Sequence, residues 1–443
     1  MIAFCFCWFT LLYGLTFLLA KNKDIFSPIR FVAIKYAILN LSFILYLCFD
    51  PNSFYKKILR VCNVTLEQAF LQYTIVQTIA LISLVAGMLV FRTKTQAIKP
   101  VLEQYNYKST KILSIIFFIV GSIAYMIFLS RIGGLLYLLR NLSNRVALQG
   151  GQHILNFLPL LVLSCLLLLL CIKIKNKLSD KIILTVFFII TLGVYSSFGS
   201  RENSLIFIIV LIVAVNYIVS KLEFNKKSLV RLSVLTFGLF IYILVIPAIR
   251  NSDQGKQYTI SQLFNIKKLV YNISYTYIDV FAANYFNKES AWYLDGYFDP
   301  VSALFAKSDK SNIPQVDQGV YFNSIVIYQK DFRPPLPRGE VSKTSWPTEN
   351  FGFAYSNFLI PGVIIFFFLQ GNIFSIAYKL LRSDIYNPVY FLLYVLIIFT
   401  FNFSSLRIAS FIKLVPLLYL ASVIFNICVR GKSFKSSLNI NFK

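Results

Sequence analysis

Long apolar runs constrain this chain more than any other feature of its sequence. Residues 154–172 and 205–219 contain no charged side chain, and each run approaches the roughly 20 residues that cross a bilayer as a helix. Inside a membrane every backbone N–H and C=O group must be bonded within the protein, so spanning segments of this kind form helices. The sequence therefore predicts an all-α polytopic membrane protein.

The composition agrees with this class. Hydrophobic residues make up 57% of the chain and charged residues 14%, with a mean hydropathy of +0.69, whereas soluble domains carry about 25% charge. The net charge of +25 does not indicate a nucleic-acid partner, because the basic residues cluster between the apolar runs, as membrane topology requires. The seven cysteines show no metal-ligand spacing and no disulfide framework. We expect no metal and no cofactor.

Eleven apolar segments are predicted as transmembrane helices. They lie near residues 2–20, 28–49, 71–91, 112–130, 154–172, 182–199, 204–220, 230–249, 351–378, 387–404 and 408–428. This pattern gives eight helices over 1–249, one long connection over 250–350, and three helices with a tail over 351–443. Arg30 and Lys35 interrupt the second segment, and we interpret them as a span boundary or an interface anchor.

Basic residues predict the orientation. The short loops after the third, fifth, seventh and ninth spans, and the C-terminal tail, all carry lysine or arginine. Cytoplasmic loops are enriched in these residues, so these loops and the tail are predicted inside and the N-terminus outside. The outer loop at 50–70 is an exception, because it carries Lys56, Lys57 and Arg60. In this topology residues 250–350 form one long external loop.

Two parts of the long loop have distinct patterns. Residues 261–286 have apolar positions at mixed three- and four-residue spacing, which predicts an amphipathic helix lying on the membrane. Residues 333–339 contain three prolines, which exclude an α-helix because proline lacks the N–H donor. Trp346 and the loop tyrosines have flat faces with polar tips, which suit either a membrane-surface belt or sugar rings.

Four arginines are predicted on the outer side of the membrane: Arg201, Arg250, Arg338 and Arg407. The positive-inside bias disfavours arginine in short outer turns, so Arg201 and Arg407 need another reason to be there. A guanidinium binds phosphate oxygens in a fork and stays charged in a dry pocket. We therefore predict that these arginines converge on one anionic group, a diphosphate. The alternative for Arg201 is a topological role, with its side chain reaching lipid phosphates.

Three more ionisable residues belong to the candidate site. Lys413 is predicted about 9 Å deeper than Arg407, from a rise of 1.5 Å per residue, and an ionisable residue inside a span is a functional candidate. Glu202 and Glu349 are outer carboxylates and candidate general bases, although Glu349 could equally serve as a helix cap. The single histidine, His153, has no visible partner.

Four segments together resemble the Wzy-type O-antigen polymerases, which join oligosaccharide repeat units. They are R-I-G-G-L-L-Y-L-L-R-N (131–141), F-G-S-R-E-N-S-L-I-F (198–207), W-P-T-E-N-F-G-F-A-Y-S-N-F-L-I-P-G-V-I (346–364) and S-S-L-R-I-A-S-F (404–411). The long outer loop lies between the second and the third. Leu359 departs from the pattern, since the family usually has glycine at this position.

The resemblance implies a bundle of the membrane glycosyltransferase type in the bacterial inner membrane, with its active site facing the periplasm. Such enzymes transfer a growing glycan from one polyprenyl-diphosphate carrier to the outermost sugar of a new repeat unit. The product is an O-antigen or a capsule-like polysaccharide. The implied partners are the polyprenyl-diphosphate-linked oligosaccharide, membrane lipid and a chain-length regulator protein.

The resemblance also guides the assignment of site residues. Arg201 and Arg407 match the family's arginines best by position, and Arg250 and Arg338 match them less closely. The predicted catalytic residues are Arg201, Glu202, Arg407 and Glu349. The predicted substrate-binding residues are Arg250, Arg338, Lys413 and Trp346.

Two other functions remain open at this point. An O-antigen ligase shares the architecture, but the resemblance implies a histidine in its large outer loop, and residues 250–350 contain none. A flippase or transporter of the lipid-linked oligosaccharide usually shows internal repeats and charged or broken spans. From the sequence, Lys413 is the one such sign.

Overall fold

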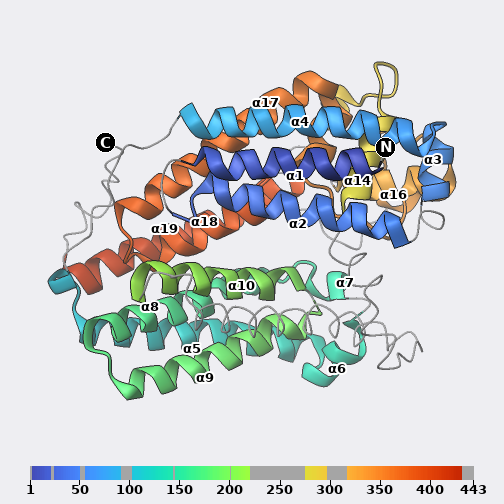
Figure 1. The fold of residues 1–443 in the computed structure, drawn as a ribbon. Coiled ribbons are helices and arrows are strands. Elements are labelled where there is room, and N and C mark those ends of the chain that lie inside the picture. Colours follow the sequence, from blue (N-terminus) through green and yellow to red (C-terminus); the bar gives the residue numbers. More distant parts are fainter. Residues whose placement is uncertain are drawn as a thin grey trace. The chain divides into compact units, whose positions relative to one another are not determined.

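The computed structural model describes residues 2–20, 24–49, 55–90, 102–142, 145–199, 201–219, 275–296 and 317–431 (Figure 1). Within these ranges the chain forms helices and turns and no β-strand. The predicted span at 230–249, Arg250, residues 261–274 and the tail beyond Gly431 lie outside the described residues.

Nine helical segments in the described ranges are long and apolar enough to cross a membrane. They coincide with nine of the predicted spans, and a tenth span corresponds to the shorter apolar helix α18 (Pro388–Thr400). The spanning helices are α1 (Ile2–Leu19), α2 (Pro28–Phe49), α4 (Leu66–Val90), α5 (Tyr107–Ile132), α8 (Pro159–Lys175), α9 (Leu178–Ser197), α10 (Arg201–Ala214), α17 (Asn350–Ser383) and α19 (Ser405–Arg430). The multi-pass membrane class is therefore confirmed for the described residues.

Shorter elements connect these helices. Their bounds are α3 (Tyr55–Cys62), η1 (Leu102–Gln104), α6 (Leu135–Arg140), α7 (Arg145–Gln149), η3 (His153–Phe157), the π-helical η4 (Val215–Val219), α14 (Thr276–Tyr285), η5 (Tyr293–Gly296), α16 (Gln318–Tyr328) and η6 (Arg338–Glu340). The element η3 leads into α8, and η4 continues α10.

The chain divides into two compact units, and each unit takes segments from distant parts of the sequence. Unit 1 comprises Met1–Thr93, Phe264–Tyr378 and Thr400–Ile412. Unit 2 comprises Lys94–Leu263, Lys379–Phe399 and Lys413–Lys443. The compact units therefore do not follow the order of spans and loop along the chain.

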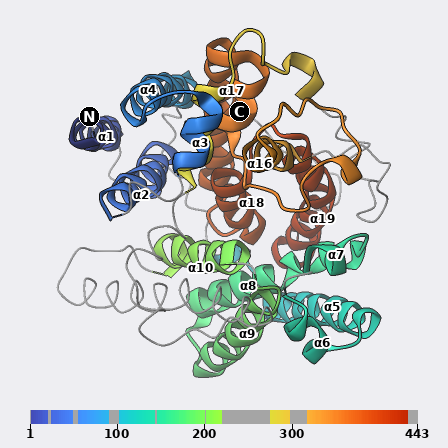
Figure 2. The same ribbon diagram turned by 90° about the vertical axis from the view of Figure 1, so that its right-hand side faces the viewer.

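In unit 1, α1 packs beside α2 and α4 (Figure 2), and α14 packs against α2, α3 and α4. Seven of the ten residues of α14 are buried. Apolar side chains occur on every side of α14, and a helix of this kind lies inside a protein. The described part of the segment 261–286, which was predicted to lie on the membrane, is thus enclosed by other helices of unit 1.

The helix α17 is broken within its membrane span. Leu359 has φ 55° and ψ −141°, and Pro361 follows two residues later. The segment that follows α14 packs against this break, because the backbone N–H of Trp292 donates to the Ser356 carbonyl at 2.8 Å. A Cβ atom on Gly296 would lie 2.2 Å from the Asn357 amide oxygen, so this close approach requires glycine. The break lies at the position where the sequence departs from the family pattern.

In unit 2, α8 packs between α5 and α9 and also contacts α10 (Figure 2). Its middle, from Leu160 to Cys171, is buried throughout. A helix that is apolar on all sides occupies the centre of a bundle. The run 154–172 that opened the sequence argument is therefore the central helix of this unit.

Candidate functional site

An ion pair inside unit 1 joins two residues far apart in the sequence. Lys35 of α2 and Glu349, which directly precedes α17, approach to 3.3 Å between Nζ and Oε2. The Lys35 side chain is 12% exposed and that of Glu349 is 42% exposed. The interpretation of Lys35 as a span boundary or interface anchor was therefore wrong. Arg30 donates to the Ala20 carbonyl, just after the end of α1, at 3.2 Å, and its role at a membrane interface stays a prediction.

Asp279 of α14 adds a second carboxyl group beside this ion pair. It is partly buried and interacts electrostatically with both Lys35 and Glu349. Burial raises the pKa of Asp279 well above its usual range, the nearby Glu349 carboxylate raises it further, and the Lys35 ammonium lowers it by a smaller amount. Lys35, Asp279 and Glu349 are called the lysine–carboxylate cluster below.

A buried hydrogen-bond network fixes α14 beside this cluster. The amide oxygen of Asn40 accepts from the Tyr73 hydroxyl at 2.5 Å and from the Thr276 hydroxyl at 3.2 Å. The amide nitrogen of Asn40 donates to the Tyr13 hydroxyl. Thr276 precedes Asp279 by one helical turn, so both residues lie on the same face of α14. The network therefore joins α1, α2, α4 and α14 and orients the Asp279 face toward α2.

A second charged group in unit 1 lies at the start of α16. One carboxylate oxygen of Asp317 accepts from the Gly319 N–H at 2.9 Å and caps this helix. Burial raises the pKa of Asp317, while hydrogen bonds from Ser345 and Gly319 and the positive charge of Arg407 lower it by smaller amounts. Arg407, in the first turn of α19, is thus close enough to act on this partly buried carboxyl group.

The segment 345–350 links the two charged groups. Ser345 bonds Asp317, the Trp346 N–H donates to the Gly319 carbonyl at 3.1 Å, and Glu349 pairs with Lys35. The same segment contacts the turn before α19, because the Phe403 N–H donates to the Asn350 side chain at 3.3 Å. Four residues span at most about 14 Å when fully extended. Ser345 and Glu349 are therefore close, and both charged groups lie along one short segment.

The predicted site residues fall in both units. Glu349, Trp346, Arg338 and Arg407 belong to unit 1, whereas Arg201, Glu202 and Lys413 belong to unit 2. The backbone of Arg201 begins α10, Glu202 is exposed in its first turn, and Lys413 is partly buried in α19. Arg250 lies outside the described residues. Convergence of the four arginines on one anion stays a prediction.

Two of the predicted binding residues lie in packed surroundings. The Trp346 ring packs edge-on against Tyr277 and Phe281 of α14, with centroid distances of 5.3 and 5.9 Å. Arg338 begins the short turn η6 and is partly buried. The preceding proline-rich residues form no α-helix, as their sequence predicts. They pack on α16, where the Tyr321 hydroxyl accepts from the Leu336 N–H at 2.9 Å.

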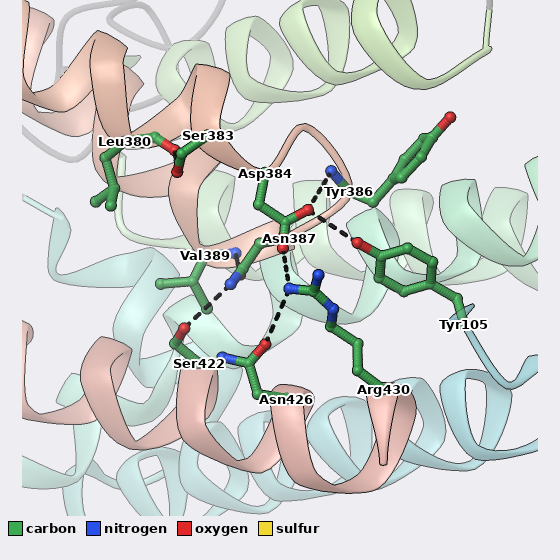
Figure 3. Close-up of polar contacts among 10 residues, drawn as sticks. All are labelled: Tyr105, Leu380, Ser383, Asp384, Tyr386, Asn387, Val389, Ser422, Asn426 and Arg430. Carbon is green, nitrogen blue, oxygen red and sulfur yellow. Dashed lines mark hydrogen bonds and ion pairs between the residues drawn. The ribbon is translucent and has the colours of Figure 1, made fainter. Parts of the chain in front are cut away.

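Unit 2 holds a different polar cluster, centred on Asp384 (Figure 3). Its carboxylate accepts from Arg430 at 2.6 Å, from the Tyr105 hydroxyl at 2.9 Å and from the Tyr386 N–H at 3.2 Å. Burial and the Asp384 charge raise the pKa of Tyr105 above its usual range, which keeps this hydroxyl a donor. Both carboxylate oxygens are occupied by protein donors, so this cluster is best explained as a structural connection.

The Asp384 cluster also bears on the topology. It joins the loop before α5, the loop before α18 and the end of α19. The loop between α8 and α9 meets the same end of α5, since Lys111 pairs with the buried Asp180 at 2.8 Å. These four segments were all predicted on the cytoplasmic side, and the structure brings them together at one end of unit 2. Arg430, assigned to a basic tail from the sequence, is instead paired inside the unit.

Sequence reasoning missed Asp279, Asp317 and Asp384 and misread Lys35. A usable signal was present for Asp279, which is the one charged residue in the apolar stretch T-Y-I-D-V-F-A-A. A charge in such surroundings needs a partner if it becomes buried. Among the described residues, His, Cys, Asp and Glu side chains form no group that could hold a metal ion. Comparisons with protein-family models, curated proteins and solved structures find no match to this chain.

Proposed function

We propose that this protein is a glycosyltransferase that polymerises oligosaccharide repeat units carried on polyprenyl diphosphate, at the outer face of a bacterial inner membrane. The observation that carries the proposal is the ionic pair of Lys35 and Glu349 beside a second, partly buried carboxyl group. Carboxyl groups in unlike environments are the usual components of acid–base chemistry. The family resemblance supplies the substrate class.

The proposed reaction needs a base and a stabilised leaving group. Glu349 takes the proton of the acceptor hydroxyl, whose oxygen then bonds to the anomeric carbon of the donor glycan. The bond from this carbon to the diphosphate breaks, and the diphosphate leaves with the electron pair. Arginines stabilise the charge that develops on the leaving group. Arg407 of unit 1 is the arginine whose charge acts on Asp317, which Ser345 links to the segment that contains Glu349.

One observation favours a second candidate function, a transporter of the lipid-linked oligosaccharide. Broken spanning helices with charged partners are typical of transporter sites. The sequence pointed to Lys413 alone, but α17 is broken at Leu359, about 14 Å from its start at 1.5 Å per residue, and α2 carries the paired Lys35. The expectation that such features are missing was therefore wrong.

The length distribution of surface glycan distinguishes these functions. A strain lacking the protein is complemented with the wild type, Glu349→Gln or Glu340→Gln at matched protein levels. Glu340 is exposed in the same external segment, so it is the control. A polymerase predicts long chains with the control and single repeats with Glu349→Gln. Full-length polymer from Glu349→Gln overturns Glu349 as the base. Absence of all surface glycan in the deletion strain, with lipid-linked units retained inside, supports the transporter instead.

A further inference from the structure

Two lysines and a tyrosine meet at one end of unit 2, where α5 begins and α8 is followed by α9. Tyr107 is the first residue of α5, Lys175 is the last of α8, and Lys177 is the N-cap of α9. The Lys175 Nζ atom lies 4.9 Å from the centroid of the Tyr107 ring, and the Lys177 Nζ atom lies 5.2 Å from it. Both ammonium groups therefore contact one ring. These three residues are called the lysine–tyrosine site below.

The protein fixes this arrangement from beneath. The Tyr107 hydroxyl donates to the Asp180 carboxylate, at 2.9 Å from one oxygen and 3.2 Å from the other. The Asp180 side chain is fully buried, and it also pairs with Lys111 at 2.8 Å. Asn176 adopts the left-handed conformation, with φ 45°, and makes the tight turn between α8 and α9. The tyrosine ring is thus held in place, and the lysines on either side of Asn176 leave the backbone close together.

The positive charge at the lysine–tyrosine site is not balanced within the part of the chain that the structure describes. The carboxylate of Asp180 has Lys111 as its counter-ion, and neither Lys175 nor Lys177 forms an ion pair with a described residue. Both of these lysines are exposed. Two ammonium groups at one ring repel each other, and an anion that binds both removes this repulsion. The site therefore favours an anionic ligand.

The surrounding elements have the same sign of charge. The described ends of η1, α5, α8 and α9 at this site carry six lysines and two acids: Lys108, Lys111, Lys173, Lys175, Lys177, Lys181, Glu103 and Asp180. The neighbouring pair of Arg430 and Asp384 adds no net charge. A cluster of this kind between spanning helices is typical of sites for lipid headgroups.

Apolar surface borders the lysine–tyrosine site along the same helices. Ile112 and Ile116 are exposed on α5, and Leu178 and Ile182 are exposed at the start of α9. Exposed apolar surface on a helix of spanning length contacts acyl chains. A ligand with an anionic head and apolar chains matches both surfaces, whereas a free phosphate would use the lysines alone. Lysines at helix ends commonly reach lipid phosphates one at a time, but here one fixed ring holds two of them.

We propose that the lysine–tyrosine site binds the phosphate of an anionic phospholipid in the adjacent leaflet, with the acyl chains lying along α5 and α9. Each ammonium group keeps N–H donors for the phosphate oxygens while its other side contacts the ring. Lipid binding at this site is independent of the glycan chemistry proposed above.

Native mass spectrometry of the purified full-length protein, titrated with phosphatidylglycerol in detergent, measures the dissociation constant of the first bound lipid. The test variant is Lys175→Ala/Lys177→Ala. The matched control is Lys288→Ala/Lys330→Ala, which removes two exposed lysines of unit 1 and hence the same charge. We expect about 25-fold weaker binding for the test variant, from about 1 kcal/mol for each lysine near an anionic lipid at 1.4 kcal/mol per tenfold. Equal constants for the two variants overturn the proposal, because total charge would then explain binding.

A conservative variant separates loss of binding from loss of folding. Lys175→Arg/Lys177→Arg keeps both charges, and arginine also stacks on aromatic rings. This variant should bind phosphatidylglycerol about as tightly as the wild type. Weak binding by the arginine variant, with the same melting temperature as the wild type, contradicts recognition by charge at this site.

Two further ligands identify the source of the phosphate. Phosphatidylcholine carries a phosphate and acyl chains but no net charge, and glycerol 3-phosphate carries the phosphate without acyl chains. Both should bind more than tenfold less tightly than phosphatidylglycerol. Glycerol 3-phosphate that binds as tightly as the lipid would make this a site for free phosphate, and equal binding of phosphatidylcholine would show that net charge is not recognised. Either result overturns the proposal.

Discussion

Leu359 adopts a backbone conformation that ordinarily requires glycine, and replacing it tests the break in α17. At φ 55° and ψ −141°, a residue with a Cβ atom is strained by about 1–3 kcal/mol. Leu359→Ala keeps this strain and loses a partly buried leucine side chain. Full burial of such a side chain stabilises the folded protein by about 1.5–3 kcal/mol, so partial burial contributes about 1 kcal/mol. Leu359→Gly loses the same side chain but relieves the strain.

Leu359→Gly should therefore be more stable than Leu359→Ala. Glycine adds chain entropy to the unfolded state, which offsets about 0.5–1 kcal/mol of the relief. We expect Leu359→Gly to be about 1 kcal/mol more stable than Leu359→Ala, or about 2–4 °C in melting temperature by the scaling for domains of 150–250 residues. The assay is thermal unfolding of both purified variants in one detergent.

A regular position in the same helix provides the control. Ile373 is partly buried in α17 with helical geometry, so Ile373→Gly should be about 1 kcal/mol less stable than Ile373→Ala. The order of the glycine and alanine variants should thus reverse between the two positions. Leu359→Gly melting below Leu359→Ala would refute the strained break, because a continuous helix would give the same order at both sites.

Three further predictions concern charged residues. Asp384→Asn should destabilise unit 2 by about 3–5 kcal/mol in thermal unfolding, because it leaves the Arg430 side chain, which is 14% exposed, charged and without its anion. The control Glu103→Gln changes an exposed residue near Tyr105 and should be nearly neutral. Similar losses of stability in both variants would contradict this prediction. Asp317→Asn should flatten the pH dependence of stability while asparagine still caps the helix. A raised folded pKa makes stability fall as the pH rises from the unfolded pKa through the folded one. An unchanged slope would argue against a raised pKa of Asp317. Arg201→Lys and Arg407→Lys should each lower polymerisation by about 10²–10³-fold, or roughly 2.7–4 kcal/mol of barrier, because lysine lacks the guanidinium fork. The control is Lys227→Ala, in the basic loop that follows the seventh predicted span. Chain lengths like those of this control would return the two arginines to a topological role.

The sequence by itself determined the class of this protein and the positions of most spans. Nine helices and the shorter α18 lie where apolar runs predicted them, because the membrane requires every spanning backbone group to bond locally. The absence of an α-helix at residues 333–337 also follows from local chemistry, since each proline lacks a backbone N–H donor. Local chemistry of this kind can be read without knowing which segments meet.

The charge pairs depended on the tertiary structure. Lys35 and Glu349 are 314 residues apart, and Tyr105 and Asp384 are 279 residues apart. No periodicity in either segment encodes the partner, so Lys35 was read as an anchor and Asp279 was overlooked. Whether a charged side chain meets lipid, water or an opposite charge is decided by which helices pack around it. The strain at Leu359 is likewise tertiary, because the segment after α14 packs at the break in α17, beside a residue that the local sequence would not choose there.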